Sequence, residues 1–418
     1  MPAEYKWDLI VCGAGAAGLM AAGRAVERGL RVLVLEKMEA PGHKILVTGN
    51  GRCNLTNAAP MEDFITAFGK NGRFLRHAFH AFFRDDLLAL LGRYGMQIIQ
   101  EGDGRLFPES GRAADVRNTL RNLANGSVFH FGSSVNAIVP CAGADSCRLQ
   151  VHCGGQCHSA RSIVLAMGGC SWPGTGSSGD GYDILRGLGH AVAPLYPALT
   201  ALILQGRDME SVEGVSVADC VLSCSVQAGG RVLDTRRGAI IFTAHGISGP
   251  AALNISGSVA ALLAEENGAC LSIDFLPGRQ RTDLEAEIIS AARDRSAKTL
   301  FHYLRSLVPS RLAQTILDLG KIPGNIRFYS LERQHRRFVV SSLKSFVLPL
   351  SGVEGFDKAM MTRGGVSLKE VEPRTMESRK IPGLYIAGEL LDLDGPTGGY
   401  NLQAAFSTGR LAGDSVPA

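Results

Sequence analysis

Three glycines and one carboxylate near the N-terminus have the residue types and spacing that bind a dinucleotide. Gly13, Gly15 and Gly18 directly follow an apolar run, and Glu36 ends a second apolar run roughly twenty residues further on. The first glycine permits a tight turn, the second lets the backbone approach a pyrophosphate, and the third lets a helix pack closely on a strand. An acid at the position of Glu36 accepts hydrogen bonds from a ribose 2′-hydroxyl, which favours FAD or NAD over a phosphorylated cofactor.

Two strands and one helix must hold these residues in place. The runs 9–12 and 31–35 predict buried parallel strands, and the small residues of 16–28 predict the helix between them. The free N–H groups at the start of that helix, near Ala16 and Ala17, would receive the pyrophosphate. The alternative is a glycine-rich turn in another kind of α/β unit.

A polar segment, residues 41–57, follows the second strand. It is too rich in Gly, Asn and Thr to belong to a core, so we expect it to lie along the cofactor, where Lys44 and Arg52 would neutralise phosphate charge. A surface loop is the alternative. We expect seven residues between the second strand and the end of this segment to lie beside the cofactor: Lys37, Lys44, Thr48, Gly51, Arg52, Cys53 and Asn54.

The C-terminal region returns to strands that end in glycine. The strand 383–387 ends in Gly388 and Glu389, and a carboxylate there would bind the ribityl chain of a flavin. A helix that begins near Asn401 would point its N–H groups at the flavin ring. Together with the N-terminal fingerprint, this element favours FAD over NAD. The residues expected at the cofactor from strand ends and from this helix are Gly168, Gly388, Glu389, Gly399, Tyr400 and Asn401.

Composition limits the other functions. The chain has 418 residues, 45% hydrophobic content and a net charge of +4, so it is globular, and its charge argues against nucleic acid as a partner. Ten cysteines without a C-x-x-C pair predict unpaired thiols, no metal site and a cytoplasmic location. The apolar run 9–22 is broken by glycines and too short for a bilayer, so we expect no membrane association.

The middle of the chain differs in composition from its two ends. From about Pro194 to residue 275, short alternating runs with glycine turns predict a β-rich domain, and 282–320 predicts helices. The basic group at 333–337 predicts a solvated helix face, and the alternative is a phosphate or nucleic-acid site. A second G-x-G-x-x-G, at 174–179, follows Trp172-Pro173 and not a strand, so it predicts a turn into a helix at 182–188.

Three motifs carry a resemblance to a known family: Thr48 to Asn57, Thr362 to Val366 with Thr375 to Ser378, and Gly388 to Gln403. The chain resembles the BaiN/YhiN-type NAD(P)/FAD-dependent oxidoreductases over nearly its whole length. The resemblance implies an α/β fold. Its FAD-binding Rossmann domain would be discontinuous and of the glutathione-reductase type, and a β-barrel-like domain and a helical subdomain would be inserted into it. The expected domains are 1–193 and 347–418 for FAD, with the insertion at 194–346 and its helical piece at about 280–335.

The same resemblance implies an enzyme, an FAD-dependent oxidoreductase that moves hydride between a nicotinamide donor or small organic substrate and an acceptor. FAD is the expected cofactor, NADH or NADPH the transient donor, and a small molecule the substrate. The alternatives are an FAD-dependent enzyme that modifies nucleic acid such as tRNA, a monooxygenase, and a flavin-binding redox module without catalysis. The catalytic candidates are Cys53 as a redox thiol, and Tyr400 or His245 as a proton donor. His245 stands one position later than in the family pattern, which weakens any family role for it.

Overall fold

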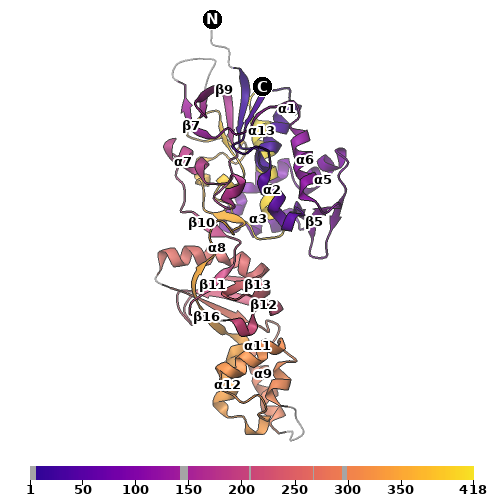
Figure 1. Ribbon diagram of the computed structural model, residues 1–418, viewed down its shortest axis with the longest axis vertical. Helices are drawn as coiled ribbons and strands as arrows, with labels where there is room; N and C mark the ends of the chain where they lie inside the picture. The colour runs from indigo at the N-terminus through magenta and orange to yellow at the C-terminus, as the bar shows by residue number, and fades with distance from the viewer. Residues whose placement is uncertain (1–5, 142–148, 207–208, 267, 294–298) are drawn as a thin grey trace. The chain divides into compact units, whose positions relative to one another are not determined.

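The chain folds into two compact units, one of which is inserted into the other. In the computed structural model, which describes residues 6–141, 149–206, 209–266, 268–293 and 299–418, unit 1 comprises Met1–Tyr196 and Phe356–Ala418. Unit 2 comprises Pro197–Gly355. Figure 1 shows both, with the indigo and yellow ends of the chain together in unit 1.

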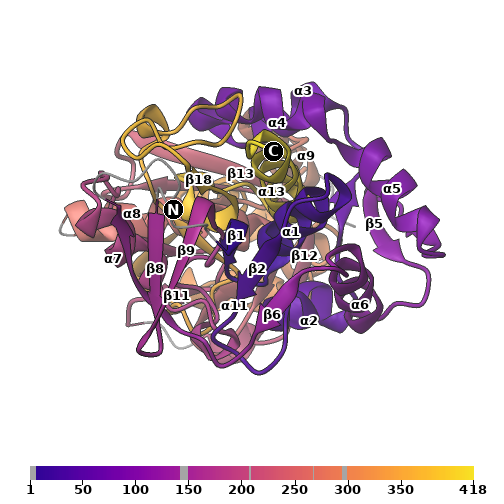
Figure 2. The same ribbon diagram turned by 90° about the horizontal axis from the view of Figure 1, so that it is seen from above.

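Unit 1 is built on a parallel sheet whose central strands, β1 and β2, are apolar and largely buried. Its order is β6-β2-β1-β9, and β18 pairs with β9 on the other side. Figure 2 shows these strands from above. The N-terminal half of β9 continues into an antiparallel arm of β8 and β7. The bounds are β1 (Trp7–Cys12), β2 (Val32–Leu35), β6 (Val128–His130), β7 (Val135–Pro140), β8 (Leu149–Cys153), β9 (Gln156–Leu165) and β18 (Leu384–Ile386).

The rest of unit 1 combines helices, a small antiparallel sheet of order β3-β5-β4 and irregular segments. The helices are α1 (Ala16–Glu27), α2 (His43–Val47), α3 (Met61–Ala67), α4 (Arg76–Ala81), α5 (Arg84–Arg93), α6 (Ala113–Leu123), α7 (Asp180–Gly187) and α13 (Tyr400–Ser415). The remaining strands are β3 (Thr56–Asn57), β4 (Ile98–Gln100), β5 (Arg105–Pro108) and β17 (Met361–Arg363), and β10 (Tyr196–Ala198) spans the boundary of the units.

Helices α1 and α13 pack together through residues without bulky side chains. A Cβ at Gly409 would lie 2.2 Å from the carbonyl oxygen of Ala17, and a Cβ at Gly413 would lie 2.4 Å from that of Ala21. The two backbones therefore approach as closely as glycine allows. This contact fixes the last helix of the chain against the helix of the N-terminal fingerprint.

Unit 2 contains a closed six-stranded antiparallel barrel of order β11-β14-β13-β12-β15-β16. The strands are β11 (Leu202–Leu204), β12 (Ser216–Ser225), β13 (Val232–Phe242), β14 (Gly246–Ser248), β15 (Ala269–Asp274) and β16 (Phe346–Val353). The helices are α8 (Pro250–Glu265), α9 (Arg281–Ala291), α10 (Leu300–Leu304), α11 (Ser310–Leu319) and α12 (Arg333–Lys344). In Figure 1, α9, α11 and α12 lie together at one end of this unit.

The expected barrel in an FAD-binding Rossmann fold is confirmed, with differences in detail. β16 closes the barrel by pairing with β11 and β15, so unit 2 extends past residue 346, where the predicted insertion ends. β6 pairs in parallel with β2 and takes no part in the antiparallel arm of β7 and β8. The segment from Val232 to Phe242 forms one continuous strand, β13. Within the described residues, no helix combines the length and apolarity of a membrane crossing.

Candidate functional site

The sequence-predicted residues gather at one edge of the parallel sheet. β1, β2, β9 and β18 run in the same direction and end at Cys12, Leu35, Leu165 and Ile386. The fingerprint turn, Glu36, Gly168 and Gly388-Glu389 therefore follow neighbouring carboxyl ends. In open α/β sheets this edge is where ligands bind.

The fingerprint turn is shaped by contacts that only glycine permits at two positions. Gly13 has φ 97°, and a Cβ there would lie 2.5 Å from the carbonyl oxygen of Ala166. A Cβ at Gly18 would lie 1.9 Å from the carbonyl oxygen of Gly13. A Cβ at Gly15, in contrast, would meet no atom within 4 Å. The turn is thus closed against the sheet and open at Gly15.

The N-terminus of α1 has the features of an anion site. Its N-cap is Gly15, no described side chain caps it, and its first turn contains no acidic residue. The Glu36 carboxylate lies beside the turn, where it accepts hydrogen bonds from the N–H of Ala14 at 2.7 Å and of Met38 at 2.9 Å. The arrangement suits a pyrophosphate at the helix and a ribose at the carboxylate.

Glu389 is held by polar groups from three separate parts of unit 1. One carboxylate oxygen accepts hydrogen bonds from the Ser171 hydroxyl at 2.7 Å and the Thr362 N–H at 2.9 Å. The other lies 2.6 Å from the Nζ of Lys44. Burial opposes ionisation of Glu389, but Lys44 and these hydrogen bonds outweigh burial and lower the pKa of this carboxyl. Glu389 is therefore a fixed negative charge next to the sheet edge.

Lys44 and Arg52 each have a carboxylate partner, which changes the role expected for them. Lys44 also binds the Ser171 hydroxyl at 2.6 Å, besides Glu389. Arg52 pairs with Glu101 at 2.6 Å, and its guanidinium lies 4.1 Å from the ring centroid of Phe107. The charge of both cations is thus compensated within the protein, and their expected task of neutralising phosphate stays a prediction.

The segment 48–57 is not a surface loop throughout. Cys53, Leu55 and Thr56 are fully buried, contrary to the expectation that its composition excludes it from the core. The chain reaches that burial through left-handed residues, among them Asn50 with φ 55° and Cys53 with φ 62°. Non-glycine residues with a left-handed backbone conformation are strained, and such strain concentrates at functional sites.

Cys53 lies in an environment that disfavours a reactive thiolate. Burial raises the pKa of its thiol to about 12, although a hydrogen bond with Thr48 acts in the opposite direction. It is a free cysteine, as are the other described cysteines. The hydroxyl of Thr48 also donates to the carbonyl of Ile45 at 2.6 Å, so the Thr48 side chain stabilises the loop conformation. Gly51, also in the loop, has φ 82°.

The start of α13 meets the end of that loop. The N-cap Gly399 has φ 96°, and a Cβ there would lie 2.5 Å from the carbonyl carbon of Thr56. With its amide oriented to satisfy both neighbours, Asn54 donates to the Thr56 carbonyl at 3.1 Å and accepts from the Gly399 N–H at 3.0 Å. Two segments of predicted cofactor contacts, 48–57 and 398–401, thereby form one surface.

Tyr400 and Asn401 have different roles at this helix start. The Tyr400 ring lies 4.4 Å from that of Phe64, and burial followed by the nearby Asp63 raises the pKa of its hydroxyl. The Asn401 side chain accepts from the Gly395 N–H at 2.8 Å and donates to the Gly395 carbonyl at 2.9 Å. Asn401 therefore shapes the 395–401 turn, whereas Tyr400 is half-buried and keeps its proton at neutral pH.

Lys37 and Gly168 lie at the same sheet edge. The Nζ of Lys37 binds Asp180 at 2.7 Å and also the hydroxyl of Ser178. Gly168 has φ 75°, and a Cβ there would lie 2.6 Å from the Ser177 hydroxyl oxygen. Both residues connect the ends of β2 and β9 to the 174–179 turn, whose glycines lead into α7 and not into a second nucleotide fold.

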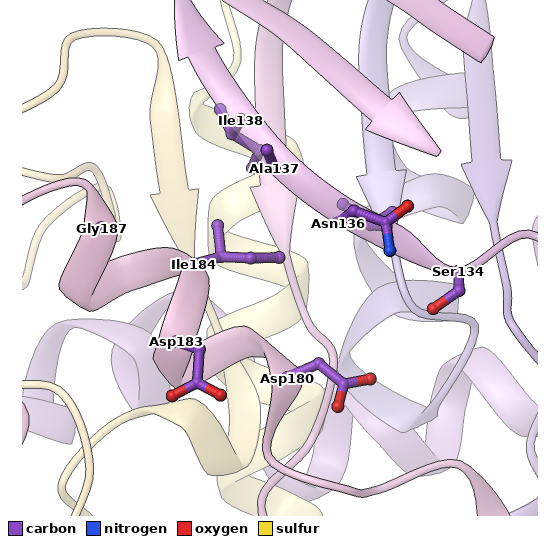
Figure 3. Close-up of a pocket in the computed structure, with 9 residues that line it drawn as sticks. Ser134, Asn136, Ala137, Ile138, Asp180, Asp183, Ile184 and Gly187 are labelled. Atoms are coloured by element: carbon purple, nitrogen blue, oxygen red, sulfur yellow. The ribbon is translucent and has the colours of Figure 1, made fainter. Parts of the chain in front are cut away.

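A polar groove lies between β7 and α7, at the side of this edge (Figure 3). It has a volume of about 560 Å³ and is lined by residues 134–138 and by Asp180, Asp183, Ile184 and Gly187. Asp180 and Asp183 are paired with Lys37 and Arg186. Among the described residues, no group of His, Cys, Asp and Glu has the arrangement of a metal site.

The remaining catalytic candidate, His245, lies elsewhere. It is exposed in the turn between β13 and β14 of unit 2, so it is not among the residues that unit 1 brings together. Sequence reasoning missed Ser171, Thr362 and Asp180. Thr362 begins one of the motifs that carry the family resemblance, which was a usable signal, whereas nothing in the local sequence marks Ser171.

Comparison with known proteins agrees with this geometry. The family described as "HI0933-like protein Rossmann domain" matches residues 7–415. A 3-dehydro-bile acid delta(4,6)-reductase of Clostridium scindens is 33% identical over 407 residues, covering 96% of this chain and 97% of that protein. A ribosomal RNA dihydrouridine synthase of Escherichia coli is 31% identical over 404 residues, covering 96% of both. A flavocytochrome c3 fumarate reductase shares the fold at TM-score 0.51 and 18% identity, over 99% of this chain and 78% of that chain.

The fold and the sheet-edge site define an FAD-binding Rossmann oxidoreductase. The chain belongs to the HI0933-like Rossmann family of BaiN/YhiN-type FAD-dependent oxidoreductases. The expected fold class, family and enzyme class are thereby confirmed.

Proposed function

We propose that this enzyme uses NADH or NADPH to reduce a carbon–carbon double bond conjugated with a carbonyl group. The observation that carries the proposal is a likeness between two relatives that each match the chain almost end to end. One is named for reducing the Δ4,6 bonds of a 3-dehydro bile acid, and the other for making dihydrouridine in ribosomal RNA. In both cases a double bond in conjugation with a ring carbonyl becomes saturated.

The open fingerprint turn supports the placement of FAD. The N–H groups of Ala16 and Ala17 and the open face of Gly15 would hold the pyrophosphate, and Glu36 would hold the adenosine ribose. Glu389 and the N-terminus of α13 would face the ribityl chain and the ring, where a positive helix end favours the reduced cofactor. FAD, when bound, supplies the two-electron chemistry that no side chain can provide.

The net reaction balances as a two-electron reduction. The nicotinamide is oxidised, a hydride is added to the β-carbon of the conjugated system, and a proton is added to the α-carbon, so that the double bond becomes a single bond. We propose Tyr400 as the source of that proton. Its raised pKa keeps the hydroxyl protonated at neutral pH, and its position at the start of α13 is where the ring would lie.

The test has two halves. In the first, the purified flavoprotein is titrated anaerobically with NADH and then with NADPH, and bleaching of the flavin absorption band is followed. We expect one donor to bleach the band rapidly. In the second, reduced enzyme is mixed anaerobically with a 3-oxo-4,6-diene bile acid or with a uridine-containing oligonucleotide, and return of the band is followed.

Return of the band with a conjugated substrate, but not with its saturated product, supports the proposal. A band that neither donor bleaches would contradict the nicotinamide half of it. A reduced enzyme that only molecular oxygen reoxidises would contradict the substrate half and favour an oxidase. The cytoplasmic location expected from the cysteines stays a prediction.

A further inference from the structure

The charge of the chain is concentrated in the helical part of unit 2. Residues 281–344 contain twelve Lys or Arg and six Asp or Glu, whereas the rest of the chain contains 31 Lys or Arg and 33 Asp or Glu. The small net charge of +4 is therefore the sum of a positive segment, residues 281–344, and a slightly negative remainder of the chain. A clustered positive charge, more than the total, is the feature that attracts a polyanion.

Helix α12 presents part of this charge on one face. Its C-terminal half is buried through Val339, Val340 and Leu343, whereas Arg333 and Arg337, nearer its start, are exposed. These two arginines are four positions apart, and residues with that spacing are neighbours on a helix surface. Neither forms an ion pair with any residue that the structure describes. Arg333 also stands in the first turn, where a cation opposes the helix dipole, so helix stability does not explain it.

The other two members of the basic group are partly buried. Arg336 donates to the Leu331 carbonyl at 2.6 Å, which fixes the connection into α12, and His335 is only half-exposed. The N-cap Glu332 is the nearby opposite charge, and its carboxylate accepts from the side chain of Gln334 at 2.6 Å. The group that the sequence presents as one cluster thus separates into two partly buried residues, His335 and Arg336, and the exposed pair Arg333 and Arg337.

An exposed aromatic ring precedes the two arginines. Tyr329 is 61% exposed in a short 3-10 helix, η5 (Phe328–Ser330), that leads into α12. Its neighbour Phe328 is buried and packs edge-on against Tyr303, with ring centroids 5.6 Å apart. The turn is therefore anchored on one side and offers a ring to solvent on the other. Rings beside arginines are the elements with which proteins bind single-stranded nucleic acid, by stacking on bases and contacting phosphates.

We propose that Tyr329, Arg333 and Arg337, named the α12 face, bind RNA that carries the substrate ring. The inference rests on the proposed reduction of a conjugated double bond, because uracil within RNA is one such substrate. Single-stranded RNA is the form whose bases are free to stack on a side chain. The arginines contact backbone phosphates, and Tyr329 stacks on an unpaired base.

The test measures binding of a fluorescent single-stranded RNA of about 20 nucleotides to the full-length flavoprotein by anisotropy, at several salt concentrations and without reductant. We expect the Arg333→Glu/Arg337→Glu protein to bind at least about tenfold more weakly. Its salt slope should shrink by about 1.4, because two phosphate contacts to a single strand are lost. Tyr329→Ala should weaken binding about tenfold and leave the salt slope unchanged, because stacking releases no counterions.

The matched control is Arg73→Glu/Arg93→Glu, which makes the same charge change at two exposed positions of unit 1. Flavin content and circular dichroism of each variant establish that it is folded. A wild-type protein that does not bind RNA overturns the inference, and so does a control pair that weakens binding as much as the α12 pair. Reduction of a free conjugated ketone without RNA binding would overturn this inference alone. RNA binding by a protein whose flavin takes no electrons would overturn the proposed function alone.

Discussion

The ammonium group of Lys44 lies 2.6 Å from the carboxylate of Glu389, which joins the first and last parts of the chain across unit 1. Both side chains are largely withdrawn from solvent, with 23% and 11% of their side-chain surface exposed. The pair is completed by Ser171 and by the N–H of Thr362. Its stability contribution and its charge can be tested separately.

Lys44→Met should destabilise the protein, because it leaves the buried Glu389 without its cation. We expect the free energy of unfolding to fall by about 3 kcal/mol at pH 7, as when one partner of a buried ion pair is removed. Urea denaturation of the apoprotein measures it. The double variant Lys44→Met/Glu389→Gln should lose less than Lys44→Met alone. An equal or larger loss would mean that the lysine acts through packing and not through the carboxylate.

Stability should depend on pH through Glu389. Its folded-state pKa lies below the ordinary 4.5, so this carboxyl stabilises the folded protein above that value and ceases to do so as the pH falls through the lowered pKa. The stability difference between wild type and Glu389→Gln should therefore shrink as the pH is lowered from 5 to 3. Thermal unfolding at a series of pH values gives this difference. A gap that stays constant would show that Glu389 is not ionised when folded.

Gly15→Ala should weaken FAD binding and Gly18→Ala should lower stability, although the two glycines belong to one motif. Gly15 has φ −80° and open space where a Cβ would lie, so the variant should fold with an unchanged melting temperature. We expect its affinity for FAD to fall about tenfold or more, because the methyl group would occupy the approach of the pyrophosphate.

At Gly18 the added methyl group would collide with the Gly13 carbonyl, so Gly18→Ala should lose about 3 kcal/mol of stability. FAD titration of the apoproteins and thermal unfolding separate the two effects. An unchanged FAD affinity of the Gly15→Ala protein would mean that the pyrophosphate does not bind at Gly15.

Cys53 should not react with alkylating reagents in the native protein. Its thiol is fully buried and its pKa is raised to about 12, so almost none is thiolate at pH 8. Iodoacetamide labelling followed by peptide mapping should modify the exposed Cys157 and leave Cys53 intact. Cys53→Ser should keep both flavin half-reactions. Rapid labelling of Cys53, or loss of one half-reaction, would restore it as a redox residue.

Tyr400→Phe should separate packing from proton transfer. The ring keeps its contact with Phe64, and the lost hydroxyl forms no hydrogen bond with the part of the chain that the structure describes, so stability should change by less than about 0.5 kcal/mol. Reduction of the flavin by the nicotinamide should be unaffected. Reoxidation by the conjugated substrate should slow at least about 100-fold, the usual contribution of a general acid. Equal stopped-flow rates for both proteins would assign the proton to another group.

Local sequence predicted the elements whose signal is itself local. The fingerprint strand, helix and second strand appear as β1, α1 and β2, because apolar runs and glycine spacing dictate them without help from distant residues. The strand before Gly388 and the helix after Gly399 appear for the same reason. The barrel was also visible, as short alternating runs separated by glycines, although not its closure by β16.

Contacts between residues that are far apart in the sequence could not be predicted from the sequence. Lys44 and Arg52 both looked like free cations beside a phosphate, and their partners Glu389 and Glu101 become neighbours only when the fold forms. The burial of Cys53 was missed because a polar, glycine-rich composition is ordinarily a surface signal. Here left-handed backbone at Asn50 and Cys53 turns the segment inward. Such contacts depend on tertiary structure, which composition and periodicity do not encode.

The discontinuity of unit 1 dictates the order in which a ribosome delivers its parts. β1, α1 and β9 are synthesised first, unit 2 follows, and β18 and α13 emerge last from residues 356–418. At roughly 5–20 residues per second, this final stretch takes about 3 to 13 s. Until then one edge of β9 lacks its partner β18 and the small-residue face of α1 is uncovered. Glu389 and the start of α13, which we propose to contact the cofactor, are therefore synthesised after unit 2, and a truncation before β18 would leave β9 with an unpaired, aggregation-prone edge.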